Sequence, residues 1–489
     1  MLVDVLLDAC RSSPNAPAVS DGHISLTYRQ LGRLAAVMRA ILLQETACPR
    51  VGIMLPASTV FPASLFGALW ARKTAVPLNF LLRPEELARI VADAQIDIIL
   101  TVRHFATVAQ ALPARAVFVE DLPLRRRMLF AALARLPAAP TVQPGETAVI
   151  LYTSGTTAEP KGVELTYKNL LSNCVDTMLS LDIDPPQSFL NILPPFHVFG
   201  LTGNVLIPVF LRARVCAVPR FSPLAAVRAI AEGRLSVMLA IPSMYAAMLR
   251  VKKATPEEFR SIQIAISGGE PLPDSVRTGF EERFGVILRQ GYGLSETSPI
   301  VSACSLNQHK VGTVGRTIRN VELRIVDADS RDLPPGHDGE ILIRGPGVMK
   351  GYYRKPDETA RVLDAQGWFH TGDIGRLDAD GFLSITGRAK EMLIIGGENV
   401  FPREIEAVLE AHDAVLQSAI IGVPDGLRGE VPVAFVIPRK DQPVSEEELR
   451  AFARQRLAGF KTPRRVIVRE DLPIGPTGKI LKRRLRDLL

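Results

Sequence analysis

The stretch YTSGTTAEPKGV, from Tyr152 to Val163, is the most informative part of this sequence. It follows the apolar run TAVIL, which predicts a buried strand. It precedes a segment with apolar residues at helical spacing, for which Thr166 is a candidate N-cap. A strand, a glycine- and hydroxyl-rich loop and a helix form a phosphate-binding arrangement, because backbone N–H groups and short hydroxyls can converge on one anion. The stretch predicts an anion-binding loop, with a solvated turn as the alternative.

This loop is not a Walker phosphate loop, which needs a Gly-Lys pair followed by Ser or Thr. Here Lys161 follows Pro160 and precedes Gly162. The pattern instead resembles the phosphate loop of the adenylate-forming superfamily, and the resemblance spans nearly the whole chain. The family usually has Gly where this chain has Ala158, whose methyl group penalises a positive φ, so ATP affinity is the property affected. The resemblance implies that ATP phosphates are bound by Thr153, Ser154, Gly155, Thr156, Thr157 and Lys161, with Thr153 also near the metal.

The length and composition indicate a large globular protein, and the net charge favours small anionic ligands. At 489 residues the chain should hold two or more domains. Its five cysteines are scattered, which predicts a reducing, cytoplasmic location and neither a disulfide frame nor a zinc site. The net charge of +7 comes without a nucleic-acid-binding motif, which favours ATP and CoA as the partners. The N-terminal MLVDVLLDACRSS lacks a basic lead and predicts an amphipathic helix rather than a signal peptide.

One apolar segment, FLNILPPFHVFGLTGNVLIPVFL at residues 189–211, carries no charged residue and is long enough to span a bilayer. Prolines and glycines interrupt it repeatedly, and a helix broken so often would leave backbone groups unsatisfied in lipid. We therefore expect a buried strand, a loop and a helix beside a ligand cavity. An integral membrane lipid transporter is the alternative.

Strands and helices alternate through the first part of the chain, as in βαβ units with parallel sheets. From Gly312 to Arg388 short strands predict a small antiparallel barrel, and the remainder reads as a compact α+β unit. The predicted fold class is therefore a multidomain combination of α/β and α+β. The resemblance implies an N-terminal domain at residues 1–388, made of two flavodoxin-like halves and the barrel, and a mobile C-terminal lid at residues 389–489.

Two glycine-containing motifs resemble the nucleotide site of the same superfamily. GYGLSETSP, at residues 291–299, matches an aromatic-Gly-x-Thr-Glu motif with Ser295 in place of Thr. The resemblance implies that Glu296 binds Mg²⁺, which prefers one or two carboxylates plus substrate phosphates, and that Ser295 bonds a phosphate or carboxylate oxygen. A plain surface turn is the alternative for each motif. The residues implied to lie along adenine are Ser267, Gly268, Gly269, Gly291, Tyr292 and Gly293.

The remaining site residues follow from matches near the C-terminal end. Asp373 in HTGDIG would bind the ribose, because a carboxylate can accept two hydroxyl hydrogen bonds, and Arg388 would join it. Lys390 matches the family's hinge, a residue that absorbs backbone rotation between two domain arrangements. Lys479 would bridge the substrate carboxylate and the α-phosphate, stabilising charge as it develops. Two further roles are implied: substrate positioning without proton transfer for His197, and lining of the CoA thiol channel for Gly396 and Gly397.

These matches predict an acyl-CoA synthetase that uses ATP, Mg²⁺ and CoA. The expected acid is a medium- or long-chain fatty acid, because the pocket segments are almost wholly apolar. An aryl acid, transfer to an acyl carrier protein, fatty acyl-AMP ligation and a non-enzymatic ligand-binding role remain as alternatives. The basic and apolar segment LRRRMLFAALARL, residues 124–136, is a candidate for peripheral contact with an anionic membrane, and a solvated helix or linker is its alternative.

Overall fold

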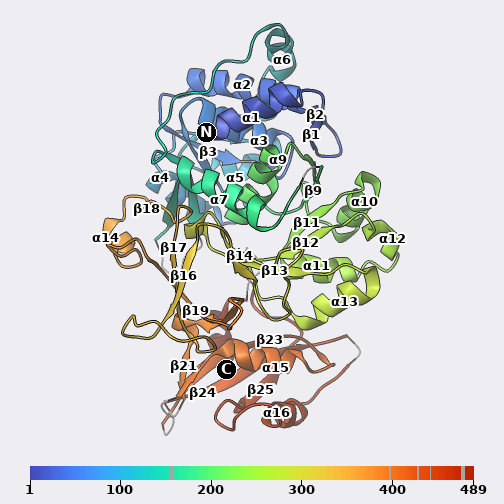
Figure 1. The fold of residues 1–489 in the computed structure, drawn as a ribbon, viewed down its shortest axis with the longest axis vertical. Coiled ribbons are helices and arrows are strands. Elements are labelled where there is room, and N and C mark those ends of the chain that lie inside the picture. Colours follow the sequence, from blue (N-terminus) through green and yellow to red (C-terminus); the bar gives the residue numbers. More distant parts are fainter. Residues whose placement is uncertain (154–158, 185, 396–397, 427–428, 441, 475–479) are drawn as a thin grey trace. The chain divides into compact units, whose positions relative to one another are not determined.

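The computed structural model describes residues 1–153, 159–184, 186–395, 398–426, 429–440, 442–474 and 480–489. The chain divides into two compact units (Figure 1). The first unit comprises Met1–Leu272, Gly279–Glu322 and Ile343–Phe369, and the second comprises Pro273–Thr278, Leu323–Leu342 and His370–Leu489. The proposed domain boundary at residue 388 stays a prediction.

A nine-stranded sheet forms one half of the first unit. Its central strands are parallel, and an antiparallel pairing closes each edge. Every residue is buried in runs such as VMLA and IAIS, because strands of a parallel sheet are covered on both faces of the sheet. In sheet order the strands are β15 (Arg316–Thr317), β14 (Ile300–Ala303), β13 (Arg289–Gly293), β12 (Ile264–Ser267), β11 (Val237–Ala240), β9 (Ser188–Asn191), β10 (Arg214–Ala217), β1 (Pro17–Ser20) and β2 (Ser25–Thr27).

A seven-stranded sheet forms the other half of the same unit. Its strands β7, β4, β3, β5 and β6 are parallel, while β8 and β18 run antiparallel at one edge. These two parallel-centred sheets confirm the predicted α/β halves. In sheet order the strands are β18 (Gly351–Tyr352), β8 (Lys161–Thr166), β7 (Thr147–Thr153), β4 (Thr74–Pro77), β3 (Arg50–Met54), β5 (Ile98–Thr101) and β6 (Arg115–Phe118).

The chain after the anion-binding loop differs from the sequence prediction. A strand, β8, follows the loop before the helix begins, and it pairs antiparallel with β7. Val163 and Leu165 of β8 are fully buried, so this strand contributes to the core as the helix was expected to do. The prediction that the loop leads directly into a helix is therefore wrong, and no helix N-terminus follows the loop directly. The N-cap is confirmed: the Thr166 hydroxyl accepts a hydrogen bond from the Asn169 N–H at 3.1 Å.

Helices of the first unit pack against the two sheets, and one close contact needs glycine. A Cβ atom on Gly67 would lie 2.7 Å from the Met38 Cβ, so its absence lets α3 approach α2 closely. The helices of the chain are α1 (Leu2–Ser12), α2 (Tyr28–Glu45), α3 (Val60–Trp70), α4 (Pro84–Asp93), α5 (Ala106–Gln110), α6 (Leu124–Leu133), α7 (Tyr167–Ser180), α8 (Val198–Leu201), α9 (Ile207–Leu211), α10 (Pro223–Gly233), α11 (Pro242–Leu249), α12 (Pro256–Phe259), α13 (Asp274–Phe284), α14 (Pro356–Ala360), α15 (Pro402–Glu410), α16 (Glu446–Arg454) and α17 (Lys482–Leu485).

The long apolar segment forms the predicted strand, loop and helix. Strand β9 is followed by a loop and then by α8, a π-helical stretch at Thr202–Leu206 and α9. Among the described residues, no helix has the length and apolar character needed to cross a membrane.

Two smaller sheets contain the rest of the strands. The predicted barrel strands form a four-stranded sheet, in which β19 and β20 are antiparallel. The final residues form the predicted α+β unit, with a hydrophobic core between its sheet and the helices α15 and α16. The strands of the four-stranded sheet, in order, are β16 (Glu322–Val326), β17 (Gly339–Arg344), β19 (Phe369–Leu377) and β20 (Leu383–Arg388). Those of the last sheet are β22 (Glu398–Val400), β21 (Leu393–Ile395), β24 (Gly429–Pro438) and β23 (Val415–Asp425), with β25 (Arg465–Val468) beside β24.

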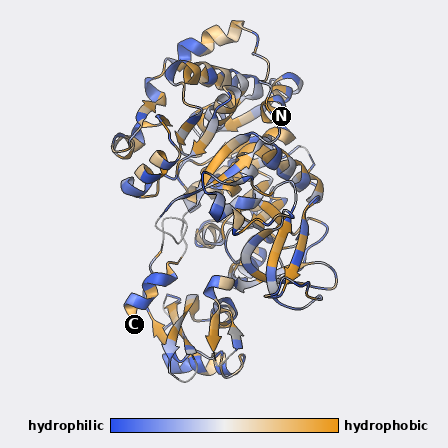
Figure 2. Cartoon of the chain, turned by 90° about the vertical axis from the view of Figure 1, so that its left-hand side faces the viewer, coloured by the Kyte–Doolittle hydropathy of each residue, from blue (hydrophilic) through white to orange (hydrophobic). Residues whose placement is uncertain are grey.

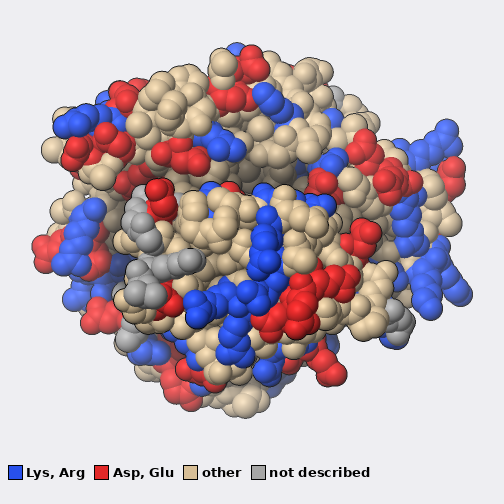
Figure 3. Space-filling model, turned by 90° about the horizontal axis from the view of Figure 1, so that it is seen from below, with Lys and Arg blue, Asp and Glu red and all other residues tan. Residues whose placement is uncertain are grey.

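Charge on the surface is mixed in sign. On the face drawn in Figure 3, Lys and Arg side chains lie beside Asp and Glu side chains. This face therefore carries no extended field of one sign, of the kind that attracts nucleic acid.

Candidate active site

The two ends of the predicted phosphate loop are held by the β7–β8 hairpin. Thr153 is the last residue of β7, Lys161 is the first residue of β8, and the two are partners in the antiparallel register. Ser154, Gly155, Thr156 and Thr157 lie outside the described residues, so their predicted phosphate contacts stay predictions. The pairing keeps the two ends of this loop close together.

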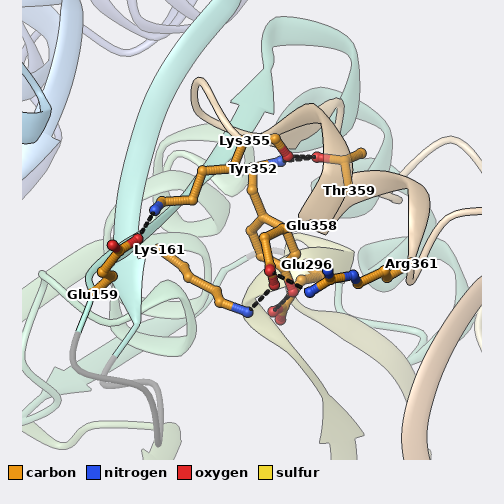
Figure 4. Close-up of polar contacts among 8 residues, drawn as sticks. All are labelled: Glu159, Lys161, Glu296, Tyr352, Lys355, Glu358, Thr359 and Arg361. Carbon is orange, nitrogen blue, oxygen red and sulfur yellow. Dashed lines mark hydrogen bonds and ion pairs between the residues drawn. The ribbon is translucent and has the colours of Figure 1, made fainter.

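Tyr352 connects the phosphate loop with the predicted magnesium ligand (Figure 4). The Tyr352 hydroxyl donates a hydrogen bond to Oε1 of Glu296 at 2.9 Å. The Lys161 ammonium lies 5.5 Å from the centre of the same tyrosine ring. Strand β18, which carries Tyr352, pairs with β8 beside Lys161. The structure thus brings together two of the residues that the sequence assigned to phosphate and metal binding.

Lys161 also has a carboxylate partner that the sequence analysis did not identify. Its Nζ lies 2.5 Å from Oε2 of Glu358. The hydrogen bond from Lys161 lowers the pKa of Glu358 below its usual value. Lys355 and Glu159 form a second pair of this kind at 2.7 Å (Figure 4). The edge of the loop therefore carries two lysine–glutamate pairs, and a bound polyphosphate would compete with the glutamates for the ammonium groups.

The two motifs predicted to hold adenine lie at the ends of adjacent parallel strands. Ser267 ends β12, and the Gly291–Gly293 segment ends β13, which pairs with β12 in parallel. A Cβ atom on Gly268 would lie 3.5 Å from the Gly291 carbonyl oxygen, so the motifs are in contact. Ligands bind at the carboxyl ends of parallel strands in open α/β sheets.

One polar atom at these strand ends lacks a partner. Ser267 is 2 % exposed, and its Oγ has no hydrogen-bond partner among the described residues. Buried hydroxyls in proteins are nearly always hydrogen-bonded. This hydroxyl lies beside two glycine motifs, and a bound purine, or a water molecule bound to it, would supply the missing hydrogen-bond partner.

A buried amide holds the turn that carries Ser295 and Glu296. This turn, the 3₁₀ segment Ser295–Thr297, is followed by β14. The Asn173 side chain, on α7 and 2 % exposed, donates to the carbonyl oxygens of Thr297 at 3.2 Å and Ile300 at 2.8 Å. Its Oδ1 accepts from the Ile300 N–H at 3.2 Å. The helix that follows the loop hairpin therefore positions the turn of the predicted magnesium ligand.

His197 lies at the start of α8, partly buried, with its ring centre 4.7 Å from that of Phe196. This is the apolar region predicted to bind the acid. A cavity of about 20 Å³ borders the same segment, and Pro195, Asn191 and Asn204 are among its lining residues. Side-chain polar atoms of both asparagines are buried without a hydrogen-bond partner in the described part of the chain. The volume suits about one water molecule, which would satisfy them.

Asp373 and Arg388 are neighbours in the second unit, as the predicted ribose site requires. They are register partners on β19 and β20, and the Arg388 Nε lies 2.9 Å from Oδ1 of Asp373. Asp373 is buried, whereas Arg388 is exposed. The arginine can therefore orient the carboxylate while leaving its second oxygen to other partners.

Lys390 is exposed in the 3₁₀ segment Ala389–Glu391, immediately after β20. Gly396, Gly397 and Lys479 lie outside the described residues, so their predicted roles stay predictions. The residues that flank the segment 475–479 are held together, because Ile474 and Ile480 form an antiparallel bridge. This bridge defines the base of the loop that carries Lys479, which is called the lysine loop below.

Lys482 connects the base of this loop to the residue after the predicted hinge. Its Nζ lies 2.9 Å from Oε2 of Glu391 and 2.8 Å from Oε1 of Glu406. Glu406 is buried and also accepts a hydrogen bond from the Ile420 N–H at 2.9 Å. Burial by itself lowers the pKa of Lys482, but the two carboxylates outweigh burial and raise it. This lysine therefore stays charged at neutral pH.

No group of three or more His, Cys, Asp or Glu side chains suited to a metal occurs in the described ranges. Glu296 supplies one carboxylate to the predicted metal position. That donor set fits Mg²⁺, which takes one or two protein carboxylates and completes its shell with water and substrate phosphates. It does not fit zinc, which needs a set of nitrogen or sulfur ligands.

Sequence reasoning missed Tyr352, Glu358 and Asn173. No pattern in GYYRKPDET pointed to the first two, because their roles arise from the pairing of β18 with a distant strand. Asn173 did leave a signal: Asn169 and Asn173 are four residues apart on a helix face that also carries Leu170 and Cys174. Amides on a buried helix face must find hydrogen-bond partners.

Comparison with known proteins identifies the family. Residues 6–353 match the family model described as AMP-binding enzyme, and residues 404–479 match its C-terminal domain. The chain therefore belongs to the AMP-binding enzyme family. This confirms the resemblance to the adenylate-forming superfamily.

Relatives are similar over nearly their whole length. A feruloyl-CoA synthase from Amycolatopsis sp is 35% identical over 482 residues, which cover 97% of this chain and 96% of that protein. A long-chain-fatty-acid–CoA ligase from Bacillus subtilis (strain 168) is 33% identical over 528 residues, covering 99% and 94%. ATP-bound MatB from Rhodopseudomonas palustris has a TM-score of 0.91 at 28% identity, covering 100% and 98%. This confirms the multidomain fold with a large N-terminal and a small C-terminal domain, and it supports an ATP-dependent acid–CoA ligase activity.

Replacing Asn173 by Ala should lower the free energy of unfolding by about 2–4 kcal/mol, because it leaves buried backbone groups without partners. Urea denaturation monitored by tryptophan fluorescence measures this change. Asn307→Ala is the matched control, since Asn307 is exposed, and it should change the value by less than about 0.5 kcal/mol. Equal effects of the two substitutions would contradict the role given to Asn173.

Replacing Lys482 by Met should destabilise the second unit by about 3 kcal/mol, because it leaves two neighbouring carboxylates without their cation. Lys461→Met is the control: Lys461 also bonds a glutamate, Glu404 at 2.7 Å, but this glutamate is more exposed. That pair should contribute less than about 1 kcal/mol. Hydrogen exchange of the amides in β23 and β24 reports the difference. Unchanged exchange in Lys482→Met would refute the assignment.

Proposed function

We propose that this protein is an acyl-CoA synthetase that activates a medium- or long-chain fatty acid with ATP. The acid's carboxylate oxygen attacks the α-phosphorus of ATP, and pyrophosphate leaves. The thiol of CoA then loses its proton and attacks the acyl carbon of the acyl-adenylate, and AMP leaves. The observation that carries the proposal is the placement of Lys161 and Glu296 at opposite ends of Tyr352, one over its ring and the other on its hydroxyl.

In this proposal the protein mainly positions reactants and neutralises charge, as phosphoryl and nucleotidyl transfers require. Lys161 exchanges Glu358 for the phosphates of ATP. Glu296, held by Tyr352, would hold Mg²⁺, and the ion would supply neutralisation of the phosphate charge there. Ser295 and Thr153 place hydroxyls on the same anion.

Recognition of the nucleoside uses the remaining motif residues. Adenine lies along Ser267, Gly268 and Gly269 on one side and Gly291, Tyr292 and Gly293 on the other. Asp373 accepts hydrogen bonds from the ribose, oriented by Arg388. The unpaired Ser267 hydroxyl and the Asp373–Arg388 pair support this part of the proposal.

The second unit supplies the groups that change between the two steps. Lys479 stabilises charge at the α-phosphate during adenylation and must then withdraw so that the thiol can approach. Lys390 is the hinge for that change, and Gly396 and Gly397 line the approach of the thiol. The bridge between Ile474 and Ile480 at the base of the lysine loop supports the role given to Lys479.

The acid is assigned from the apolar surroundings of His197. Phe196, Val198 and Leu201 are buried around it, and we assign His197 to positioning the acid without proton transfer. An aryl-acid CoA ligase is the second candidate, favoured by the 35% identity to a feruloyl-CoA synthase. An acyl carrier protein is the alternative acceptor to CoA.

Pyrophosphate exchange tests the proposal directly. With labelled pyrophosphate, ATP and Mg²⁺, we expect exchange that depends on fatty acids of increasing chain length and is weaker with hydroxycinnamic acids. Mass spectrometry of reactions with CoA or acyl carrier protein identifies the acceptor. Exchange confined to hydroxycinnamic acids would select the second candidate, and absence of exchange with every acid would show that the protein is a ligand-binding member of the family.

Replacing Lys479 by Ala should slow adenylation by about 10²–10³-fold, the usual cost of removing a group that stabilises transition-state charge. Thioester formation from supplied acyl-adenylate should change little, because the lysine has withdrawn by then. Lys440→Ala, at an exposed site of the same unit, is the control. Equal losses in both half-reactions would refute the role of Lys479.

A further inference from the structure

Helix α6 has an outward face that is apolar where a surface helix is normally polar. Leu129, Phe130 and Leu133 are 72, 64 and 91 % exposed, and they are the most exposed of the large apolar side chains among the described residues. Leu133 lies four residues after Leu129 and three after Phe130, and both spacings place side chains beside each other on a helix surface. Figure 1 shows α6 at the edge of the first unit, beyond α2, and Figure 2 colours the cartoon by the hydropathy of each residue.

The opposite face of α6 already has its packing partners. Leu124, Met128 and Ala131 pack against the main hydrophobic core. Hydrogen bonds to α2 also hold the helix, from Arg33 to the Ala132 carbonyl at 2.9 Å and from Arg127 to Gln44 at 3.0 Å. The outward residues are therefore not needed to attach the helix, and the linker alternative for this segment is wrong. An exposed apolar cluster of this kind marks an interaction surface.

Arginines share this outward face. Arg125 and Arg126 are exposed one turn before Leu129 and Phe130, and Arg135 is exposed just after the helix. The Arg126 guanidinium lies 5.9 Å from the centre of the Phe130 ring. Residues 122–145 contain no Asp or Glu. The surface is therefore apolar and positively charged, and residues 122–145 themselves supply no acidic side chain to neutralise it.

We propose that the outward face of α6 docks on an anionic lipid bilayer. Leu129, Phe130 and Leu133 enter the boundary between headgroups and acyl chains, and the arginines bond lipid phosphates. A bilayer with anionic headgroups suits this face because residues 122–145 carry arginines and no Asp or Glu, and arginines beside apolar residues are typical of helices that bind anionic lipid. This docking does not depend on which acid the protein activates.

Co-sedimentation of the full-length protein with vesicles tests the proposal. The wild-type protein should bind vesicles of phosphatidylcholine and phosphatidylglycerol, and should bind pure phosphatidylcholine vesicles at least about tenfold more weakly. The variant Leu129→Ser/Phe130→Ser/Leu133→Ser should bind the anionic vesicles about tenfold more weakly than the wild type. Arg125→Gln/Arg126→Gln should also bind weakly, with a smaller dependence on salt.

The control is Leu224→Ser, which removes an exposed leucine from α10 and should bind vesicles like the wild type. Circular dichroism verifies that each variant is folded. Failure of the wild type to bind anionic vesicles, or undiminished binding by the triple serine variant, would overturn the proposal. So would a wild-type dimer in sedimentation velocity that the triple variant abolishes, because the face would then be an interface between copies.

Discussion

The buried side chain of Asn173 is the interaction on which the candidate site most depends. The turn at Ser295–Thr297 forms backbone hydrogen bonds of its own, and the amide of Asn173 adds hydrogen bonds from α7 that fix it to this helix. The same helix holds the segment before β18, since the Asn169 amide donates to the carbonyl oxygens of Pro346 and Val348. One helix thus positions both Glu296 and the strand that carries Tyr352, and it begins directly after the loop hairpin.

This arrangement gives a physical reason for joining phosphate and metal binding in one place. Lys161 and Glu296 carry opposite charges, and Tyr352 separates them while contacting both. Burial, together with the neighbouring Glu296 carboxylate, raises the pKa of Tyr352, so its hydroxyl remains a hydrogen-bond donor at neutral pH. A cation for phosphate and a carboxylate for Mg²⁺ thus lie on the same tyrosine, where both can act on one polyphosphate.

Much of the candidate site could be predicted from sequence, because several motifs directly follow buried strands. The runs TAVIL, before the phosphate loop, and IQIAI, before the Ser267–Gly269 motif, are local patterns whose strands the structure confirms. The strand β8 between the loop and the helix was missed because KGVELT alternates too weakly to distinguish a strand, and only its pairing with β7 makes it one. Tyr352 and Glu358 could not be predicted, since they reach Lys161 across nearly two hundred residues of chain.

The sequence by itself determined the family, the α/β class, the strand before the loop, the later helix that Thr166 caps, and the residue types needed for nucleotide chemistry. These depend on hydrophobic periodicity and on motifs, which are local. Only the tertiary structure decided that Tyr352 joins Lys161 to Glu296, that Lys482 lies between Glu391 and Glu406, and that α6 turns its leucines outward. Hydrogen bonding and burial between segments far apart in the chain depend on how the sheets and helices pack, and no local pattern encodes that packing.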